Sequence, residues 1–288
     1  MSGTPVVIEA AVNGANPIAP RMPHEITETA LACFDAGAAV VHNHIDMFGD
    51  PHDAAARYRE GWEPVLAERP DALLYPTING IGTVEERYSH ITPLAETIGL
   101  RIGVIDPGSV NLGAGFAYVN SGSDIDYQQA LCERHGLVPG MSIFEPGFLR
   151  AALAYWRAGK LPPGTMLRFY FGGPAMEESG GFWFGLPPTE ASLEAYLQML
   201  GDCPLPWSVA VLGGDLFASE LPALALERGG NLRVGLEDHQ GREVANEELV
   251  AEAVKAVEQS GRSVASPSET VELLGLYRGE TTRRPGIP

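Results

Sequence analysis

The 288-residue chain has only three cysteines, Cys33, Cys132 and Cys203, and none belongs to a Cys-x-x-Cys pair. This spacing offers neither a disulfide framework nor a zinc ribbon, so we expect buried thiols. Basic residues are also few, 19 against 37 acidic ones, which gives a formal net charge of -18. Such a charge opposes long contacts with nucleic-acid phosphates, so anionic ligands must be met by a few local arginines or by a metal.

Long apolar runs and phosphate-binding glycine motifs are missing as well. No apolar stretch approaches the ~20 residues needed to span a bilayer. The glycines of Gly172-Gly173-Pro174 and Gly213-Gly214 lack the spacing and the Lys-Ser/Thr ending of phosphate fingerprints, so we interpret them as ordinary turns. The N-terminus has neither the basic start nor the small-residue cleavage site of a secretory signal, and we expect a cytoplasmic protein.

The chain does contain short β-rich apolar runs that alternate with helical patterns. Predicted strands cover Val6–Val12, Val40–Ile45, Leu73–Ile78, Ile102–Ile105, Met141–Glu145, Leu167–Phe171, Trp207–Leu212 and Leu232–Leu236. Predicted helices cover Glu25–Phe34, Ala54–Leu66, Tyr127–His135, Phe148–Ala158, Ala191–Leu200, Phe217–Arg228 and Glu247–Gln259. A last helix begins at Ser266-Pro267-Ser268-Glu269, which has a capping Ser, a Pro at the first helical position and a Glu three residues after the cap.

This alternation predicts parallel strands closed into a (β/α)8 TIM barrel of the α/β class. Such a barrel of about 250 residues is commonly one domain. We therefore expect a single domain over residues 1–288, with a C-terminal tail from about residue 277.

Polar residues stand at the ends of these strands, where a barrel carries its chemistry. His42 and His44 are two apart in an apolar run, so both imidazoles share one face of the second strand. Glu237 and Asp238 follow the eighth strand. In a closed barrel only the first strand separates this acidic pair from the two histidines. A carboxylate beside the histidines would complete a three-ligand metal site with an open position.

Simpler interpretations of the same residues exist. From the pattern alone, the histidines are more typical of a hydrogen-bonded pair in a buried strand than of a metal site, and Arg233 with Glu237 and Asp238 is typical of a salt-bridged strand end. Their shared place at the rim favours Glu237 as a metal ligand and Asp238 as a base. Glu145, which closes the fifth strand, fits a catalytic role and a turn role equally well.

Several motifs occur in an order that is typical of one group of enzymes. They are Thr27-x-Thr29-Ala30, Ala36-Gly37-Ala38-Ala39-Val40-Val41-His42-Asn43-His44, Pro107-Gly108-Ser109-Val110-Asn111, Trp207-Ser208-Val209-Ala210, Arg233-Val234-Gly235-Leu236-Glu237-Asp238 and Ser263-Val264-Ala265-Ser266-Pro267. With these motifs the chain resembles the β-keto acid cleavage enzymes, which include the 3-keto-5-aminohexanoate cleavage enzyme. The similarity runs from about Val7 to Leu276.

The resemblance implies a divalent metal, usually zinc, bound by His42, His44 and Glu237. It also implies a base at Asp238 and an arginine, Arg233, that supports developing oxyanion charge. Family members exchange acyl groups between a β-keto acid and acetyl-CoA, which gives acetoacetate and a new acyl-CoA. We therefore expect these two small molecules as partners, no nucleic acid or membrane partner, and a homo-oligomer, either a dimer or a tetramer.

The chain departs from the family pattern where the substrate is expected. Asp46 replaces an arginine after the histidines, and Gly213-Gly214-Asp215 replaces another after the seventh strand. Asn16 replaces an acidic residue, and Ile78-Asn79-Gly80 replaces a Ser/Thr-Thr-Gly. These changes favour a substrate whose distal end is less anionic, or is cationic and faces Asp46 or Asp215. The residues expected to bind substrate are Asn16, Asp46, Asn79 and Ser109.

Two alternative functions remain open from the sequence. One keeps the metal and Asp238 but drops CoA, which gives a lyase, an aldolase or a hydrolase acting on a small oxo-acid. The missing arginines favour that alternative. The other is a barrel that binds a metabolite without turning it over. The histidine that follows Asp238, His239, either orients the carboxylates or faces solvent.

Overall fold

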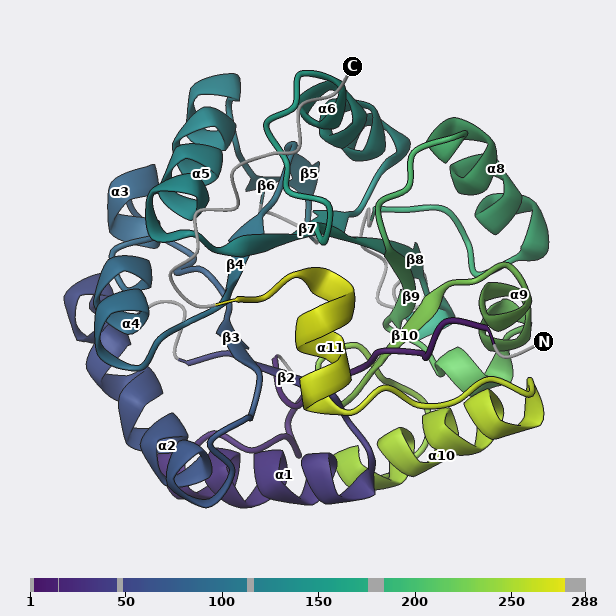
Figure 1. Ribbon diagram of the computed structural model, residues 1–288, viewed down its shortest axis with the longest axis horizontal. Coiled ribbons are helices and arrows are strands. Elements are labelled where there is room, and N and C mark those ends of the chain that lie inside the picture. The colour runs from purple at the N-terminus through teal and green to yellow at the C-terminus, as the bar shows by residue number, and fades with distance from the viewer. Residues whose placement is uncertain (1–2, 15, 46–48, 113–116, 176–183, 278–288) are drawn as a thin grey trace.

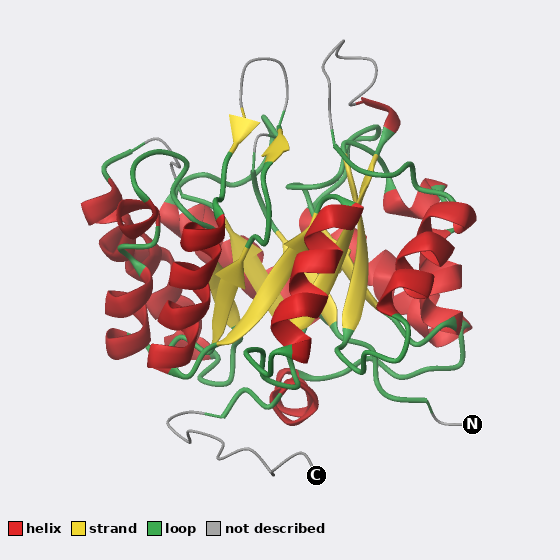
Figure 2. Cartoon of the chain, turned by 90° about the horizontal axis from the view of Figure 1, so that it is seen from above, coloured by secondary structure: helices red, strands yellow, loops and turns green. Residues whose placement is uncertain are grey.

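Eight parallel strands form one sheet that curves into a nearly closed barrel, surrounded by helices (Figures 1 and 2). The computed structural model describes residues 3–14, 16–45, 49–112, 117–175 and 184–277. The barrel strands are β1 (Ile8–Ala11), β2 (Val40–Asn43), β3 (Leu74–Pro76), β4 (Ile102–Ile105), β7 (Val138–Ile143), β8 (Met166–Gly172), β9 (Trp207–Leu212) and β10 (Asn231–Val234). The predicted (β/α)8 TIM barrel is confirmed.

The order of the strands is β3-β2-β1-β10-β9-β8-β7-β4. Its two end strands, β3 and β4, lie side by side, although no ladder of paired residues joins them over the residues described for each. Nearly every strand residue is buried, because one face packs inside the barrel and the other packs under the helices. The apolar runs in the sequence are the direct consequence of this double burial.

Helices connect the strands and cover the outside of the barrel (Figure 1). They are α1 (Pro23–Ala36), α2 (Ala54–Glu68), α3 (Val84–Arg87), α4 (Ile91–Thr97), α5 (Gly122–His135), α6 (Pro146–Arg157), α8 (Glu190–Leu200), α9 (Leu221–Glu227), α10 (Asn246–Gln259) and α11 (Pro267–Leu274), with 3-10 turns η1 (Pro51–Asp53) and η2 (Leu216–Ala218). The predicted start of α11 is confirmed, because Ser266 Oγ accepts from the Glu269 N–H and the Glu269 carboxylate accepts from the Ser266 N–H.

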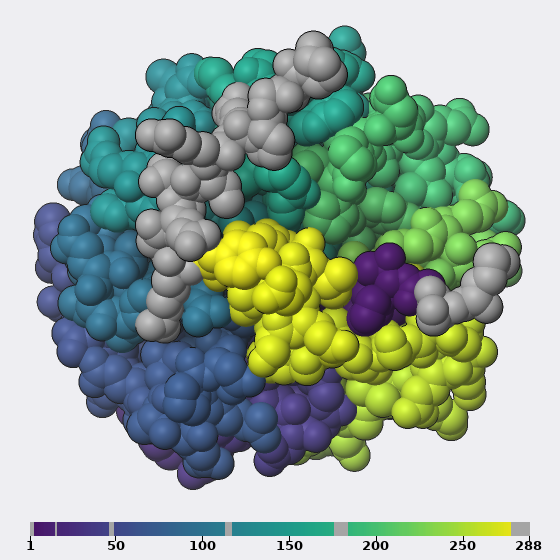
Figure 3. Space-filling model, in the orientation of Figure 1, coloured from purple at the N-terminus to yellow at the C-terminus, as the bar shows by residue number. Residues whose placement is uncertain are grey.

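The two ends of the barrel differ. α11 lies across the end where the strands begin, and in the space-filling view its yellow residues cover the centre of that face (Figures 1 and 3). Leu274 and Leu276 of this region are buried, so this end is packed. A short antiparallel hairpin of β5 (Val110–Asn111) and β6 (Ala117–Tyr118) projects from the opposite end (Figure 2). The predicted C-terminal tail after Tyr277 lies outside the described residues.

The structure differs from the sequence prediction in two connections. The region predicted as one helix over Phe217–Arg228 is η2 followed by α9. Asp215 caps η2, and Pro222 lies in the first turn of α9, where proline favours the start of a new helix. The short helices α3 and α4, between β3 and β4, were not predicted, since four and seven residues give too little periodicity.

Candidate metal centre and active site

His42 of β2, His44 just beyond its end and a glutamate beyond the last strand converge at the mouth of the barrel. His42 Nε2 lies 3.2 Å from Glu237 Oε2, and His44 Nε2 lies 3.1 Å from Glu237 Oε1. One ligand atom from each residue lies within 4.8 Å of the others. The strand order explains this convergence, because only β1 separates β2 from β10 and parallel strands end at the same rim.

A glycine after β10 brings the chain close enough to β1 for this contact. Gly235 has a φ of 132°, and a Cβ there would lie 2.1 Å from the carbonyl oxygen of Ala11. The backbone N–H of Glu237 donates to the same carbonyl at 3.1 Å. Since only glycine fits this approach, Gly235 fixes the point from which the Glu237 side chain extends.

The imidazole of His42 is held in one orientation. Its Nδ1 lies 3.1 Å from the carbonyl oxygen of Tyr75, and its ring stacks on the Tyr75 ring with centroids 4.3 Å apart. Burial lowers the pKa of His42 to about 4, so the ring is neutral near neutral pH. Because a carbonyl only accepts, Nδ1 carries the hydrogen and the lone pair of Nε2 faces Glu237.

This set of donor atoms fits a divalent cation. Burial raises the pKa of Glu237, but Arg233 and the two histidines outweigh it and hold the pKa well below its usual range. An imidazole lone pair and a carboxylate oxygen therefore face each other at His42, and two acceptors in contact need a cation to hold them together. Two imidazoles and one carboxylate are also a common catalytic zinc ligand set, with a fourth position left open.

Asp238 presents one held oxygen and one open oxygen beside these ligands. Its Oδ2 accepts from Arg233 Nε at 2.9 Å, whereas no described group hydrogen-bonds its buried Oδ1. Burial raises the pKa of Asp238 to about 7, and the neighbouring Glu237 charge adds to this effect. A carboxylate with a free oxygen and a pKa near neutrality is suited to general-base catalysis.

Arg233 joins the acidic groups of the site. Its Nη2 lies 2.8 Å from Glu237 Oε1, its Nε binds Asp238, and its Nη1 donates to the Tyr75 hydroxyl at 2.7 Å and to Glu9. The side chain is 1% exposed. Every nitrogen of the guanidinium is thus directed at a protein group, so Arg233 positions the two carboxylates.

A buried ion network under the site was missed in the sequence. Glu9 of β1 accepts from Arg168 Nε at 2.8 Å and pairs with Arg168 Nη2 at 2.7 Å, and it also contacts Arg233 and Tyr75. Burial opposes ionisation of Glu9, but the two guanidinium groups outweigh it and hold its pKa at about 2. Glu9 and Arg168 each lie in a run whose other residues are mostly apolar and were predicted as a strand. A lone acid in one buried strand and a lone base in another were the available signal.

The other predicted site residues take local roles in the structure. Glu145 precedes α6, and its Oε1 accepts from the Gly185 N–H at 3.0 Å. Asn79 is buried and donates to the Glu86 carbonyl at 3.3 Å, whereas Ser109 bonds the backbone of Asn120. Asn16 donates to the His239 carbonyl at 3.3 Å, and Asp46 lies outside the described residues. Their roles in substrate binding and catalysis stay predictions.

The structure answers two questions at the end of β9. Asp215 pairs with Arg242 at 2.8 Å and caps η2. The cation that the sequence led us to expect from the substrate at Asp215 is therefore supplied by Arg242, in the loop after β10. Both interpretations of His239 are wrong. Its ring is buried and contacts the Arg242 carbonyl at 3.0 Å and Asp215 at 3.9 Å, so it neither faces solvent nor touches the site carboxylates.

Fold and site together define a TIM-barrel protein with a candidate metal centre and a candidate base at the catalytic end of its barrel. A profile of the beta-keto acid cleavage enzymes matches residues 5–276. The chain belongs to this family, which confirms the resemblance found in its motifs, and it is an enzyme acting on β-keto acids.

Two relatives match along almost their whole length. The 3-keto-5-aminohexanoate cleavage enzyme of Acetoanaerobium sticklandii is 29% identical over 296 residues, which covers 95% of this chain and 99% of the relative. The 3-dehydrocarnitine:acetyl-CoA trimethylamine transferase of Rhizobium meliloti is 28% identical over 307 residues, which covers 95% of this chain and 97% of the relative.

Among solved structures, the apo structure of ObcA superposes with a TM-score of 0.68 at 19% identity. The match covers 90% of this chain and 66% of ObcA, slightly less than two thirds of that protein. At this identity the likeness supports the fold alone. In the described part of the chain, no helix is long and apolar enough to cross a membrane.

Proposed function

We propose that the chain is a metal-dependent β-keto acid cleavage enzyme that transfers the acyl group of a β-keto acid to CoA. The keto acid and acetyl-CoA would give acetoacetate and a new acyl-CoA. One observation carries the proposal: His42, His44 and Glu237 converge beside Asp238, whose Oδ1 has no described partner. The acetyl-CoA in the name of the Rhizobium meliloti relative supports the choice of cosubstrate.

In this proposal His42, His44 and Glu237 hold zinc or another divalent ion. When bound, the metal supplies a Lewis acid that polarises the keto and carboxylate oxygens of the substrate. Asp238 Oδ1 accepts a proton from the carbon between those two groups and returns it to the acetoacetate product. Arg233 holds Asp238 Oδ2, so that Oδ1 is presented to the substrate in one orientation.

The sequence assigned oxyanion stabilisation to Arg233, and the contacts favour a different role. Its guanidinium nitrogens already face Glu9, Tyr75, Glu237 and Asp238, and the side chain is 1% exposed. We therefore propose that Arg233 positions the ligand Glu237 and the base Asp238 without contacting the substrate. The single domain over residues 1–288, the homo-oligomer and the cytoplasmic location stay predictions.

A product assay with and without acetyl-CoA tests the function. We expect a panel of β-keto acids with neutral or cationic distal groups to be consumed only when acetyl-CoA is present, with one acetoacetate formed for each new acyl-CoA. Consumption without acetyl-CoA would instead establish the lyase, aldolase or hydrolase alternative. Tight retention of a keto acid that is never turned over would establish the metabolite-binding alternative.

A further inference from the structure

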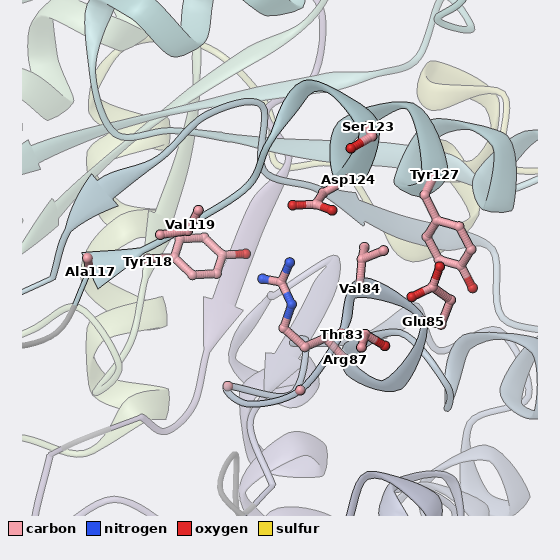
Figure 4. A pocket seen from close by; sticks show the side chains of 12 residues that line it. Thr83, Val84, Glu85, Arg87, Ala117, Tyr118, Val119, Ser123, Asp124 and Tyr127 are labelled. Carbon is pink, nitrogen blue, oxygen red and sulfur yellow. The ribbon is translucent and has the colours of Figure 1, made fainter.

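A cavity lies beside the mouth of the barrel, between α3, the β5–β6 hairpin and α5 (Figure 4). Its volume is about 560 Å³, within the range of small-molecule sites. Gly80 on its wall follows Asn79 after β3, and Tyr118 on its wall binds Asp106 at the end of β4 through a 2.6 Å hydrogen bond. The cavity thus stands on the catalytic side of the barrel, and no proposed metal ligand lines it.

Arg87 gives this cavity an unusual character. The side chain is 6% exposed, and its guanidinium lies 5.8 Å from the centre of the Tyr118 ring. Figure 4 shows it directed into the space between Tyr118 and Asp124. Within the described ranges its guanidinium neither donates a hydrogen bond nor forms an ion pair. The Asp106 carboxylate compensates the charge of Arg87 from a distance, but no described acceptor contacts its N–H groups, and this arrangement favours a ligand with an anionic oxygen group.

The rest of the lining holds groups that fit a nucleotide. A guanidinium binds phosphate through its fork of N–H groups. Glu85 and Asp124 are carboxylates of the kind that accept hydrogen bonds from ribose hydroxyls, and Tyr127 offers an aromatic ring. In a chain with a net charge of -18, an anionic cosubstrate needs such a local cation.

We propose that the Arg87 cavity binds the phosphate-bearing nucleotide end of an acyl-CoA, with Arg87 receiving a phosphate. The long flexible arm of CoA then carries the thioester from this cavity to Asp238 at the mouth. This proposal rests on the acyl-CoA dependence proposed above, and it adds the place where the cosubstrate is held.

Calorimetric titration with coenzyme A and with adenosine 3′,5′-bisphosphate tests the cavity directly. Arg87→Gln should weaken the binding of both probes by roughly 10- to 100-fold, the usual effect of losing hydrogen bonds to a charged group. In steady-state assays it should raise the KM for acetyl-CoA and not that for the β-keto acid. A rise confined to the KM for the keto acid would overturn the proposal, because Arg87 would then receive that substrate's carboxylate.

A pair of variants at an exposed position avoids any effect on folding. Val119 lines the cavity and is 58% exposed, so Val119→Lys and Val119→Glu differ in charge and little else. The lysine variant should bind coenzyme A more tightly than the glutamate variant, and the difference should shrink at high salt. The proposal would be overturned if the two Val119 variants bound coenzyme A equally tightly and Arg87→Gln bound it as tightly as the original chain. Binding that follows these predictions without acetyl-CoA turnover would leave the cavity assigned and overturn the proposed function.

Discussion

Asp238→Asn should lower kcat by roughly 10²- to 10⁴-fold, the usual contribution of a general base. The amide has nearly the same shape, so it keeps its place beside Arg233 but accepts no proton at the open position that Oδ1 now occupies. Metal content should stay near one ion per chain, because Asp238 is not among the three proposed ligands. Steady-state kinetics with elemental analysis of the same samples separates loss of the base from loss of the ion.

A matched control for this variant lies nearby. Asp215→Asn makes the same chemical change at the end of β9, where the carboxylate pairs with Arg242. It should leave kcat within a few-fold of the original chain. Full activity in Asp238→Asn would remove the proposed base from the account.

Glu9→Gln should destabilise the protein by about 3 to 5 kcal/mol, the cost of breaking a buried ion network by removing one partner. Arg168 and Arg233 would then face each other inside the barrel without the carboxylate that separates them. For a chain of this size we expect the melting temperature to fall by roughly 6 to 15 °C. Thermal and urea unfolding measure the change.

Two further variants identify the cause. Tyr75→Phe removes the hydroxyl that contacts Glu9 and Arg233 but keeps both charges balanced, and it should cost only about 1 kcal/mol. Combining Glu9→Gln with Arg168→Met should recover much of the stability, because Arg233 keeps Glu237 and Asp238 as partners. A double variant no more stable than Glu9→Gln alone would contradict the charge explanation.

Acid should remove the difference between the original chain and Glu9→Gln. The pKa of Glu9 in the folded protein is about 2, below its ordinary value of 4.5. Its stabilising contribution, roughly 3 kcal/mol for such a shift, is therefore complete above about pH 4.5 and is lost as the pH falls toward 2. The two stability curves should converge over that window. A difference that stays constant with pH would show that the negative charge of Glu9 is not the source of its stabilisation.

The barrel and its three proposed ligands were accessible from the sequence because their signals are local. Short apolar runs mark the strands, and the spacing of His42 and His44 places both on one face. The rim rule for barrels then linked them to Glu237 across a single intervening strand. Nothing beyond strand order was needed for that step.

The misplaced start of the fifth strand and the missed ion network share a tertiary cause. The fifth strand was predicted to begin at Met141, yet β7 begins at Val138 and includes Pro139 and Gly140, which resemble a turn in isolation. Gly140 is required inside the strand, because a Cβ there would lie 1.4 Å from Arg168 Nη1. The same guanidinium belongs to the missed Glu9 network. The packing of Arg168 against Gly140 and Glu9, which are distant in sequence, therefore explains both the wrong strand boundary and the missed buried charges.

The ratio of bound metal to protein chain tests the central claim most directly. Elemental analysis of protein purified without chelators should find about one divalent ion per chain, and the same amount in His24→Ala, which removes an exposed histidine that is not among the proposed ligands. His42→Ala should retain almost none. Absence of a bound ion in the original chain after incubation with zinc, or full retention in His42→Ala, would contradict the account.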